Sequence, residues 1–300
     1  NWRGRHESSK GWPSTAVSTW LNGGLFGVAV PFSAYFAGGL SGSTYGDWIT
    51  RVDFPTDTFS ILTATIGTGG RSLGSLSNNN TAGYMFGGGE ETGVSSQSDE
   101  INKMLFDSET SSVLGVAMGT AMEGMGSLAN SPTSGYLSGG SVLGVGAVST
   151  VRVFTFSSDS YASDASALSA ANNSQASFSN NGTAGYWAGG GSGIDTIDKT
   201  TFSDGSLATL SATLGAAVRN VGGTSNSGTA GYAYGGYHLG WDNLNKLTYS
   251  TDANAVISLS TALERYSITG ASNSGTAAYW YGGVNSSHSK VNSNRRDRRP

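Results

Sequence analysis

The side chains best suited to catalysis are few and scattered in this sequence. Histidine occurs three times, as His6, His238 and His288, and cysteine is absent. No two histidines are spaced as a zinc-binding pair, and a chain without cysteine has no thiolate ligand, disulfide or cysteine nucleophile. A G-x-S-x-G motif, which would present a nucleophilic serine on a sharp turn, is also absent. The sequence therefore favours a protein without a catalytic or metal-binding centre.

Two acidic clusters are the remaining candidates for ion binding. Glu90-Glu91 precedes Asp99-Glu100, and Asp195 precedes Asp198. Neither cluster has the alternating Asp/Asn spacing of a calcium-binding loop, so we interpret both as solvated loop charges. The glycine run Gly87–Gly89 lacks the G-x-G-x-x-G spacing of a dinucleotide-binding loop, and we expect no cofactor.

Aromatic side chains in two polar loops are the strongest candidates for ligand binding. These loops contain five such residues: Tyr45, Trp48, Tyr237, His238 and Trp241. Exposed rings flanked by Asp and Asn suit either a sugar or a protein contact. The alternative, that the rings pack over neighbouring loops, is equally compatible with the sequence.

A sixfold repeat must position these loops. A Tyr-x-x-Gly-Gly phrase occurs at 35–39, 84–88, 136–140, 186–190, 232–236 and 279–283. Successive tyrosines are 49, 52, 50, 46 and 47 residues apart. A polar turn of the Gly-Thr-Ala-Gly type precedes five of the six copies. Six matches at nearly constant spacing establish the repeat.

Each repeat contains the pattern of four short strands. The first strand is expected after the position held by Arg71 and its equivalents, and the second is the Tyr phrase. A third phrase has apolar residues at alternate positions and a closing aromatic, as in Ile101–Phe106, and a short fourth stretch follows a Ser/Thr/Asp turn. Four strands per repeat fit a blade, so we predict an all-β, six-bladed β-propeller of four-stranded blades. The double glycines should lie where blades converge and side chains must be small.

This arrangement resembles the kelch repeat, whose second strand ends in a double glycine and whose third strand contains an aromatic residue. The resemblance covers residues 12–293, but the tryptophan of the kelch fourth strand is missing. The phrases are most similar to the Ser/Thr/Gly-rich repeat arrays of structural proteins from tailed phages, including cyanophages. The resemblance implies a structural protein at a virion or extracellular surface.

Two classes of propeller enzyme provide a comparison. Galactose oxidase-like propellers need a cysteine-modified tyrosine, which this chain cannot form. Sialidases bind a carboxylate with an arginine cluster, and Arg71, Arg219 and Arg265 occupy equivalent positions in their repeats. The sialidase motif S-x-D-x-G-x-x-W is absent, so we favour a packing role for these arginines.

The sequence also predicts how the ring closes. Only five repeats have complete third and fourth strands, and after Gly283 only Ser289–Ser293 resembles a third strand. Because Ser14–Leu21 is similar to the fourth-strand stretch Asn254–Leu259, we expect this N-terminal strand to complete the last blade and protect its edge. The alternative is completion by another chain. The expected organisation is an N-terminal arm at 1–11, the propeller at 12–293 and a basic tail at 294–300.

Charge and hydropathy argue against two classes of partner. Residues 290–300 sum to +4 and the other 289 to −8, so the acidic body does not suit nucleic acid. The longest apolar run, Leu25–Ala37, is too short to span a bilayer, and the first residues lack an apolar signal-peptide region. We therefore expect no nucleic-acid partner and no membrane insertion.

Two sets of loops should share one face of the propeller. One set joins the second strand to the third, and the other joins the fourth strand to the first strand of the next repeat. These loops vary most between repeats. We expect this face of a non-catalytic protein to bind other structural subunits of an assembly, or a cell-surface glycan or protein. A cellular kelch-type scaffold for protein partners is the alternative. A sialidase-like glycan enzyme is less favoured.

Overall fold

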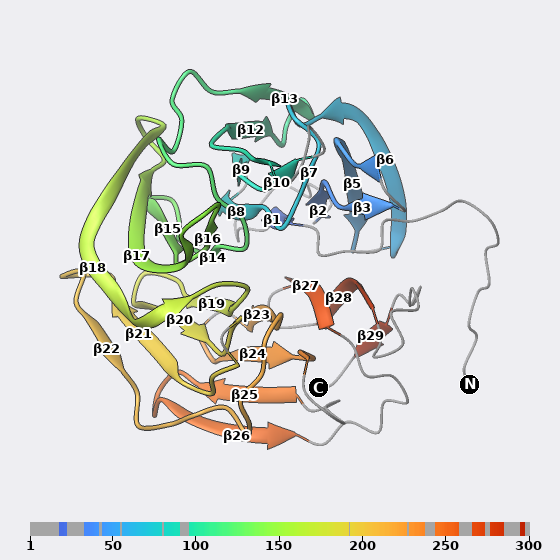
Figure 1. Ribbon diagram of the computed structural model, residues 1–300. Helices are drawn as coiled ribbons and strands as arrows, with labels where there is room; N and C mark the ends of the chain where they lie inside the picture. The colour runs from blue at the N-terminus through green and yellow to red at the C-terminus, as the bar shows by residue number, and fades with distance from the viewer. Residues whose placement is uncertain are drawn as a thin grey trace.

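A computed structural model describes the chain at 18–22, 33–41, 44–54, 56–79, 81–90, 96–191, 193–226, 228–237, 244–257, 266–273, 277–284 and 295–297. Small antiparallel sheets are arranged around a common axis, as Figure 1 shows. The protein is an all-β propeller with five blades of mostly four strands. This confirms the predicted all-β propeller of four-stranded blades, but not the predicted number of six blades.

Within each blade, the strands follow one another outward from the axis in sequence order. Blade one consists of β1 (Ser18–Asn22), β2 (Ser33–Ala37), β5 (Trp48–Asp53) and β6 (Thr58–Thr65). Blade two consists of β8 (Gly74–Asn78), β9 (Ala82–Phe86), β12 (Ile101–Leu105) and β13 (Thr110–Val113). Blade three consists of β14 (Gly126–Asn130), β15 (Ser134–Ser138), β17 (Gly146–Thr155) and β18 (Ser160–Asn172), with the short β16 (Ser141–Val142) beside β17. Blade four consists of β19 (Ala176–Asn180), β20 (Ala184–Ala188), β21 (Ile197–Thr201) and β22 (Leu207–Thr209). Blade five consists of β23 (Gly222–Asn226), β24 (Ala230–Tyr234), β25 (Leu244–Thr248) and β26 (Ala253–Ile257).

Short strands in the connections pair across loops. β3 (Leu40–Ser41) pairs with β4 (Thr44–Tyr45). β10 (Gly89–Glu90) pairs on one side with β7 (Gly70–Arg71) and on the other with β11 (Ser96–Gln97). A further sheet contains β27 (Tyr266–Asn273), β28 (Ala277–Val284) and β29 (Arg295–Asp297). It lies between blade five and blade one, as Figure 1 shows.

The predicted order of strands is confirmed in the five blades, but the predicted closure is not confirmed. Ser18–Asn22 pairs with β2 as the first strand of blade one, with Trp20 opposite Tyr35. It therefore occupies the place that Leu76 and its neighbours occupy in blade two, and not that of a fourth strand. Residues 14–17 and the expected third strand at 289–293 lie outside the described residues; the strand that pairs with β28 is β29.

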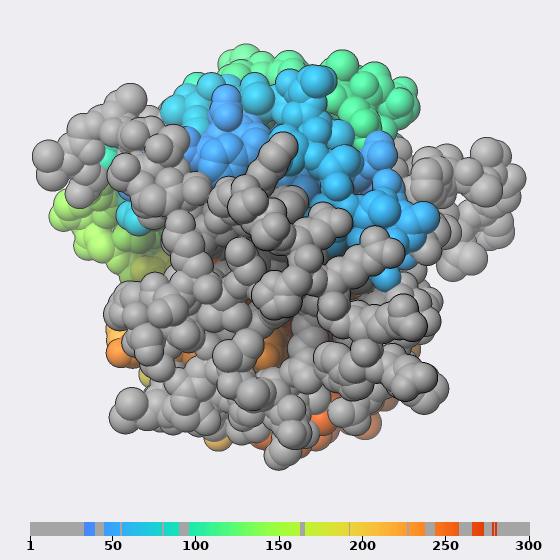
Figure 2. All heavy atoms as spheres, turned by 90° about the vertical axis from the view of Figure 1, so that its right-hand side faces the viewer, coloured from blue at the N-terminus to red at the C-terminus, as the bar shows by residue number. Residues whose placement is uncertain are grey.

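The core lies between adjacent blades. The second strand of four blades is buried along its whole length, because each of its two faces packs against a neighbouring blade. In four of the six Tyr-x-x-Gly-Gly phrases, the tyrosine stacks on the closing aromatic of the next blade's third-strand phrase. The ring centroids are 5.1 to 5.5 Å apart in four pairs: Tyr35–Phe106, Tyr84–Phe156, Tyr136–Phe202 and Tyr186–Tyr249. The side view of Figure 2 shows residues of blade one, in blue, against those of blade two, in green.

The hydroxyls of these tyrosines belong to a second contact between blades. Tyr84 donates to Asp159 Oδ1 at 2.8 Å, and Lys103, opposite Tyr84 on β12, lies 2.7 Å from Asp159 Oδ2. Asp159 lies in the turn between β17 and β18 of the next blade. We call this Tyr–cation–carboxylate set a clasp. Equivalent clasps are Tyr186–Lys199–Asp252, with distances of 2.9 and 2.6 Å, and Tyr35–Arg51–Glu109, with distances of 3.2 and 2.6 Å.

The interface between blades three and four has neither the cation nor the carboxylate of a clasp. Val153 stands opposite Tyr136, where the other blades have Lys or Arg. The facing turn has Gly205, with φ +69°, at the position where Glu109, Asp159 and Asp252 have φ of 49° to 52°. The cation and the carboxylate are thus lost together, which indicates that they function as a pair.

Buried polar side chains on the third strands connect blades two, four and five to the preceding blade. Asn102 Oδ1 accepts from the backbone N–H of Gly67 at 2.7 Å, and Asn245 Oδ1 accepts from that of Gly215 at 2.9 Å. In blade four, Asp198 accepts from the N–H and hydroxyl of Ser169. Asp198 is only 5% exposed, so its interpretation as a solvated loop charge is wrong.

The double glycines have a more specific role than small size near the axis. In all five blades, both glycines have positive φ, from 56° to 135°. Gly88 N–H donates to Met122 O, at the entry to the next blade, at 2.9 Å, and a Cβ on Gly87 would lie 2.4 Å from the same oxygen. In three other blades the corresponding N–H groups, from Gly39, Gly140 and Gly190, donate to the end of the segment that leads into the next blade. Glycine is thus required by the backbone conformation and by the close approach of two blades.

The clasp predicts coupling between Lys103 and Asp159. Asp159→Gly should lower the free energy of unfolding by about 2 kcal/mol, because it leaves Lys103 and the Tyr84 hydroxyl without their acceptor. Adding Lys103→Val recreates the natural Val153–Gly205 pairing and should recover about 1 kcal/mol of that loss. Urea denaturation of the four proteins of this double-mutant cycle measures the coupling. Additive effects of the two substitutions would contradict the clasp.

The clasp tyrosines also predict a loss of stability in alkali. Burial, together with the hydrogen bond to Asp159, raises the pKa of the Tyr84 hydroxyl well above its ordinary value. Above pH 10 the unfolded chain releases this proton while the folded protein retains it, so the free energy of unfolding should fall as pH rises. The contribution of one such tyrosine is about 1.4 kcal/mol per pH unit. Urea midpoints between pH 9 and 11 should fall less steeply in Tyr84→Phe, and an unchanged slope would disprove the assignment.

Candidate binding face

The two ends of the propeller are formed by different strand connections. The turns between third and fourth strands, which carry the clasp carboxylates, lie at one end. The connections between second and third strands, and between successive blades, lie at the other. We call the second end the loop face. Of the five aromatic candidates, the three that the structure describes, Tyr45, Trp48 and Tyr237, lie at this face.

A ring of left-handed residues surrounds the axis at the loop face. One such residue precedes the first strand in four successive blades, and a fifth lies at the start of β27, with φ between 52° and 68°: Ser72, Gly124, Ser174, Asn220 and Ser267. Gly124 N–H donates to Ser72 O and Ser174 N–H donates to Gly124 O, both at 2.7 Å. Ser267 N–H donates to Asn220 O at 3.0 Å. Backbone hydrogen bonds therefore connect neighbouring blades directly at the mouth of the axial cavity.

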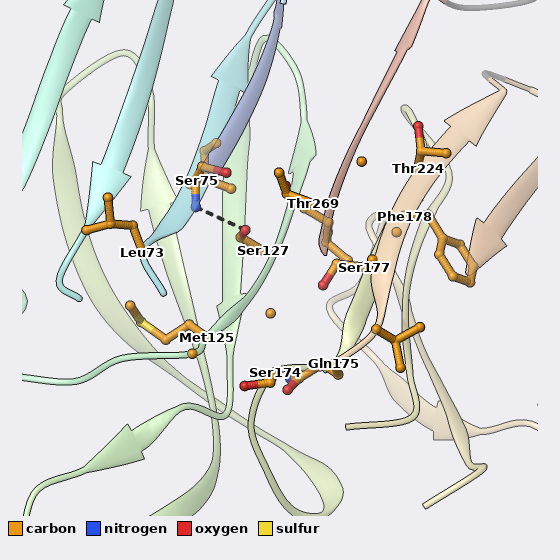
Figure 3. A pocket seen from close by; sticks show the side chains of 18 of the residues that line it. Leu73, Ser75, Met125, Ser127, Ser174, Gln175, Ser177, Phe178, Thr224 and Thr269 are labelled. Carbon is orange, nitrogen blue, oxygen red and sulfur yellow. Dashed lines mark hydrogen bonds between the residues drawn. The ribbon is translucent and has the colours of Figure 1, made fainter. Parts of the chain in front are cut away.

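The axial cavity has a volume of about 670 Å³ and is lined mainly by serine, threonine, glycine and asparagine. Figure 3 shows it from close by, with the N–H of Ser75 donating to Ser127 Oγ across two first strands at 3.0 Å. Ser179 and Ser272 form similar bonds, to Ala129 O and Ser225 O. Much of the hydroxyl lining therefore joins neighbouring blades.

Tyr45 and Trp48 lie half-buried at the loop face of blade one. The guanidinium carbon of Arg71 lies 5.5 Å from the centre of the Tyr45 ring. The Trp48 ring occupies the space where a side chain on Gly46 would otherwise lie. Both rings therefore contact their own loop or the next blade.

Tyr237 is presented differently at the loop face of blade five. Its side chain is 43% exposed, and its ring meets Tyr266 edge-on, with centroids 5.1 Å apart. The guanidinium carbon of Arg219 lies 4.4 Å from the centre of the Tyr237 ring. Tyr237 N–H donates to Arg219 O at 2.7 Å, which fixes the two backbones together. We call Arg219, Tyr237 and Tyr266 the blade-five platform.

The candidates do not form one continuous group among the described residues. Tyr45 and Trp48 belong to blade one and Tyr237 to blade five, with the sheet β27–β29 between them. His238, Trp241 and Arg265 lie outside the described residues. Of the three equivalent arginines, Arg71 and Arg219 each pack on a tyrosine, and Arg71 Nε also lies 3.5 Å from Glu123 Oε2.

An apolar hairpin at the loop face of blade three was missed from the sequence. Leu143 and Val145, in the turn between β16 and β17, are 58% and 73% exposed. Gln97 of blade two fixes this turn, since its side chain donates to Ser141 O at 3.0 Å and accepts from Leu143 N–H at 2.8 Å. The run Val142–Val145 was the available signal, but an apolar run alone does not distinguish a displayed turn from a buried strand.

Comparison with known proteins assigns no family. No protein-family model matches the chain, and no curated protein matches it. Within the described part of the chain, no three His, Cys, Asp or Glu side chains are grouped so that they could hold a metal ion. No helix in that part is long and apolar enough to cross a membrane.

Proposed function

We propose that the protein is a non-catalytic recognition module whose loop face binds carbohydrate at a cell surface. The observation that carries this proposal is the blade-five platform, where Tyr237 is exposed and held in place by Arg219 and Tyr266. A fixed aromatic ring loses little conformational entropy on binding and presents a flat apolar surface beside polar groups. Sugars have the same combination of apolar faces and hydroxyl groups.

The absence of catalysis is part of the proposal. Charged residues at the junctions between blades have structural partners there, as for Lys103 with Asp159 and for Asp198 with Ser169. Arg71, one of the three arginines that a sialidase-like site would require, is paired with Glu123. These contacts support a packing role.

The proposed setting is an assembly at a virion or extracellular surface, in which other structural subunits contact the propeller. The resemblance to Ser/Thr/Gly-rich phage repeat arrays supports this setting. The exposed Leu143–Val145 turn is a suitable contact for such a subunit, because it displays apolar side chains on a turn fixed by Gln97.

We further propose that β27–β29 is the inner part of a sixth blade. Tyr279 of β28 is opposite Arg296 of β29, as Tyr35 is opposite Arg51 and Tyr84 is opposite Lys103. The first strands of the five blades and β27 also follow one another around the axis, with β27 beside both β23 and β1. A sixth blade would place β29 in the position of a third strand.

A constant spacing also relates β27 to the first strands of the blades. Each left-handed residue in the turn between third and fourth strands lies seventeen positions before a fixed residue of the next first strand, the one that pairs with the position two after the repeated tyrosine. This holds for five pairs: Asp57–Gly74, Glu109–Gly126, Asp159–Ala176, Gly205–Gly222 and Asp252–Thr269. Thr269 of β27 thus stands at the same distance after blade five as the first strands of the other blades stand after the blades before them, which supports β27 as the first strand of a sixth blade.

Carbohydrate binding is tested with an array of cell-surface glycans and the variant Tyr237→Ala. Binding to at least one glycan class should weaken tenfold or more, because the variant removes the exposed ring. The control is Ile61→Ala, which removes an exposed apolar side chain from the outer strand β6 and should leave binding unchanged. Failure of the intact protein to bind any glycan would refute the proposal.

A further inference from the structure

Arg71 and Arg219 provide an internal comparison at the loop face. Each precedes the left-handed residue of its blade, Ser72 or Asn220, and each guanidinium lies over a tyrosine ring. Their anionic partners differ. Glu123 accompanies Arg71, whereas the described residues place no carboxylate within ion-pairing distance of Arg219. The charge of Arg71 is therefore offset by a neighbouring carboxylate, whereas no described carboxylate offsets the charge of Arg219.

The positive charge of Arg219 is also accessible. Arg219 is exposed, and the ring beneath it is 43% exposed. A guanidinium that lies over an aromatic ring uses its face for that contact and directs its N–H donors outward in its own plane. The bond from Tyr237 N–H to Arg219 O and the edge-on contact with Tyr266 hold the ring beneath the cation.

A planar, oriented guanidinium matches the geometry of a carboxylate, which accepts two parallel hydrogen bonds from it. Stacking reduces the conformational freedom that Arg219 would otherwise lose on binding. The Tyr237 ring next to this cation can contact the apolar face of a sugar that bears the carboxylate. The platform thus combines a site for a negative charge with a surface for a sugar ring.

We propose that the blade-five platform binds the carboxylate of an acidic sugar, with Arg219 pairing with the carboxylate and Tyr237 contacting the sugar ring. This inference rests on the proposed carbohydrate-binding function and specifies its ligand class. Blade two has no equivalent site, because Glu123 already occupies the anionic position beside Arg71.

The test compares a trimer of galacturonic acid with its methyl ester, which has the same rings without the charge. Isothermal titration calorimetry with the intact protein should show at least tenfold tighter binding of the acid. Arg219→Ala should remove this preference. Arg219→Lys should restore only part of it, because an ammonium group is a point charge and does not pair through two parallel bonds. Binding of the acid should also weaken as salt increases.

Arg71→Ala is the matched control, since it removes an equal charge from the equivalent position of blade two. Acid binding should stay within twofold of the intact protein. Circular dichroism melting curves should coincide for the intact protein and Arg219→Ala, whose side chain is exposed. An equal loss of binding in Arg71→Ala would overturn the assignment to Arg219 and indicate an effect of overall charge.

Three further outcomes separate this inference from the proposed function. Equal affinity for the acid and its ester, unaffected by Arg219→Ala, would refute the acidic ligand and leave carbohydrate binding intact. A sulfated neutral trimer that binds as tightly as the acid would refute the preference for carboxylate. Tight binding of a glutamate trimer, with the same dependence on Arg219, would refute the sugar and identify a site for acidic protein segments.

Discussion

A tyrosine that reaches from one blade into the next is the interaction on which this propeller depends. In blade two, the Tyr84 ring stacks on Phe156 and its hydroxyl donates to Asp159. One side chain thereby joins the apolar core between blades to an ion pair at its edge.

The clasps also make the two ends of the molecule unequal. At the clasp end, turn geometry is constrained, because a residue such as Asp159 must keep a left-handed conformation and direct its carboxylate at the preceding blade. At the loop face, contacts between blades involve mostly backbone groups, as in the bonds of Gly124 and Ser174. Backbone contacts constrain side-chain identity less, so the loops there are free to differ between blades.

Much of the fold could be predicted because the repeat is local. The Tyr phrase and the third-strand phrase each lie within six residues, and both form the predicted strands. The contacts between blades could not be predicted in the same way, since Tyr84 and Asp159 are separated by 75 residues and share no motif. Ser18–Leu21 was assigned to the wrong strand because first and fourth strands have similar short Ser/Thr-rich patterns. Hydrogen-bond register distinguishes them, and sequence alone does not contain that register.

The exposure of the aromatic candidates could not be predicted from the sequence either. Tyr45 and Tyr237 looked equivalent in the sequence, but only Tyr237 is extensively exposed. Their difference depends on neighbours distant in the chain, including Glu123 beside Arg71 and Tyr266 beside Tyr237. The presence of an aromatic ring could be predicted, but not its surroundings.

The paired loss of charge between blades three and four has a consequence for the order of the blades. If a lysine-bearing blade preceded blade four, its ammonium would face Gly205, and if blade three preceded a carboxylate-bearing blade, that carboxylate would face Val153. Both mismatched junctions would leave a charge without its partner. Nearly identical repeats thus acquire a preferred sequence of neighbours, which would disfavour blades docking out of order during folding. Recombination that moved blade three or blade four alone would disturb this order, whereas moving the two together would preserve the junction between them.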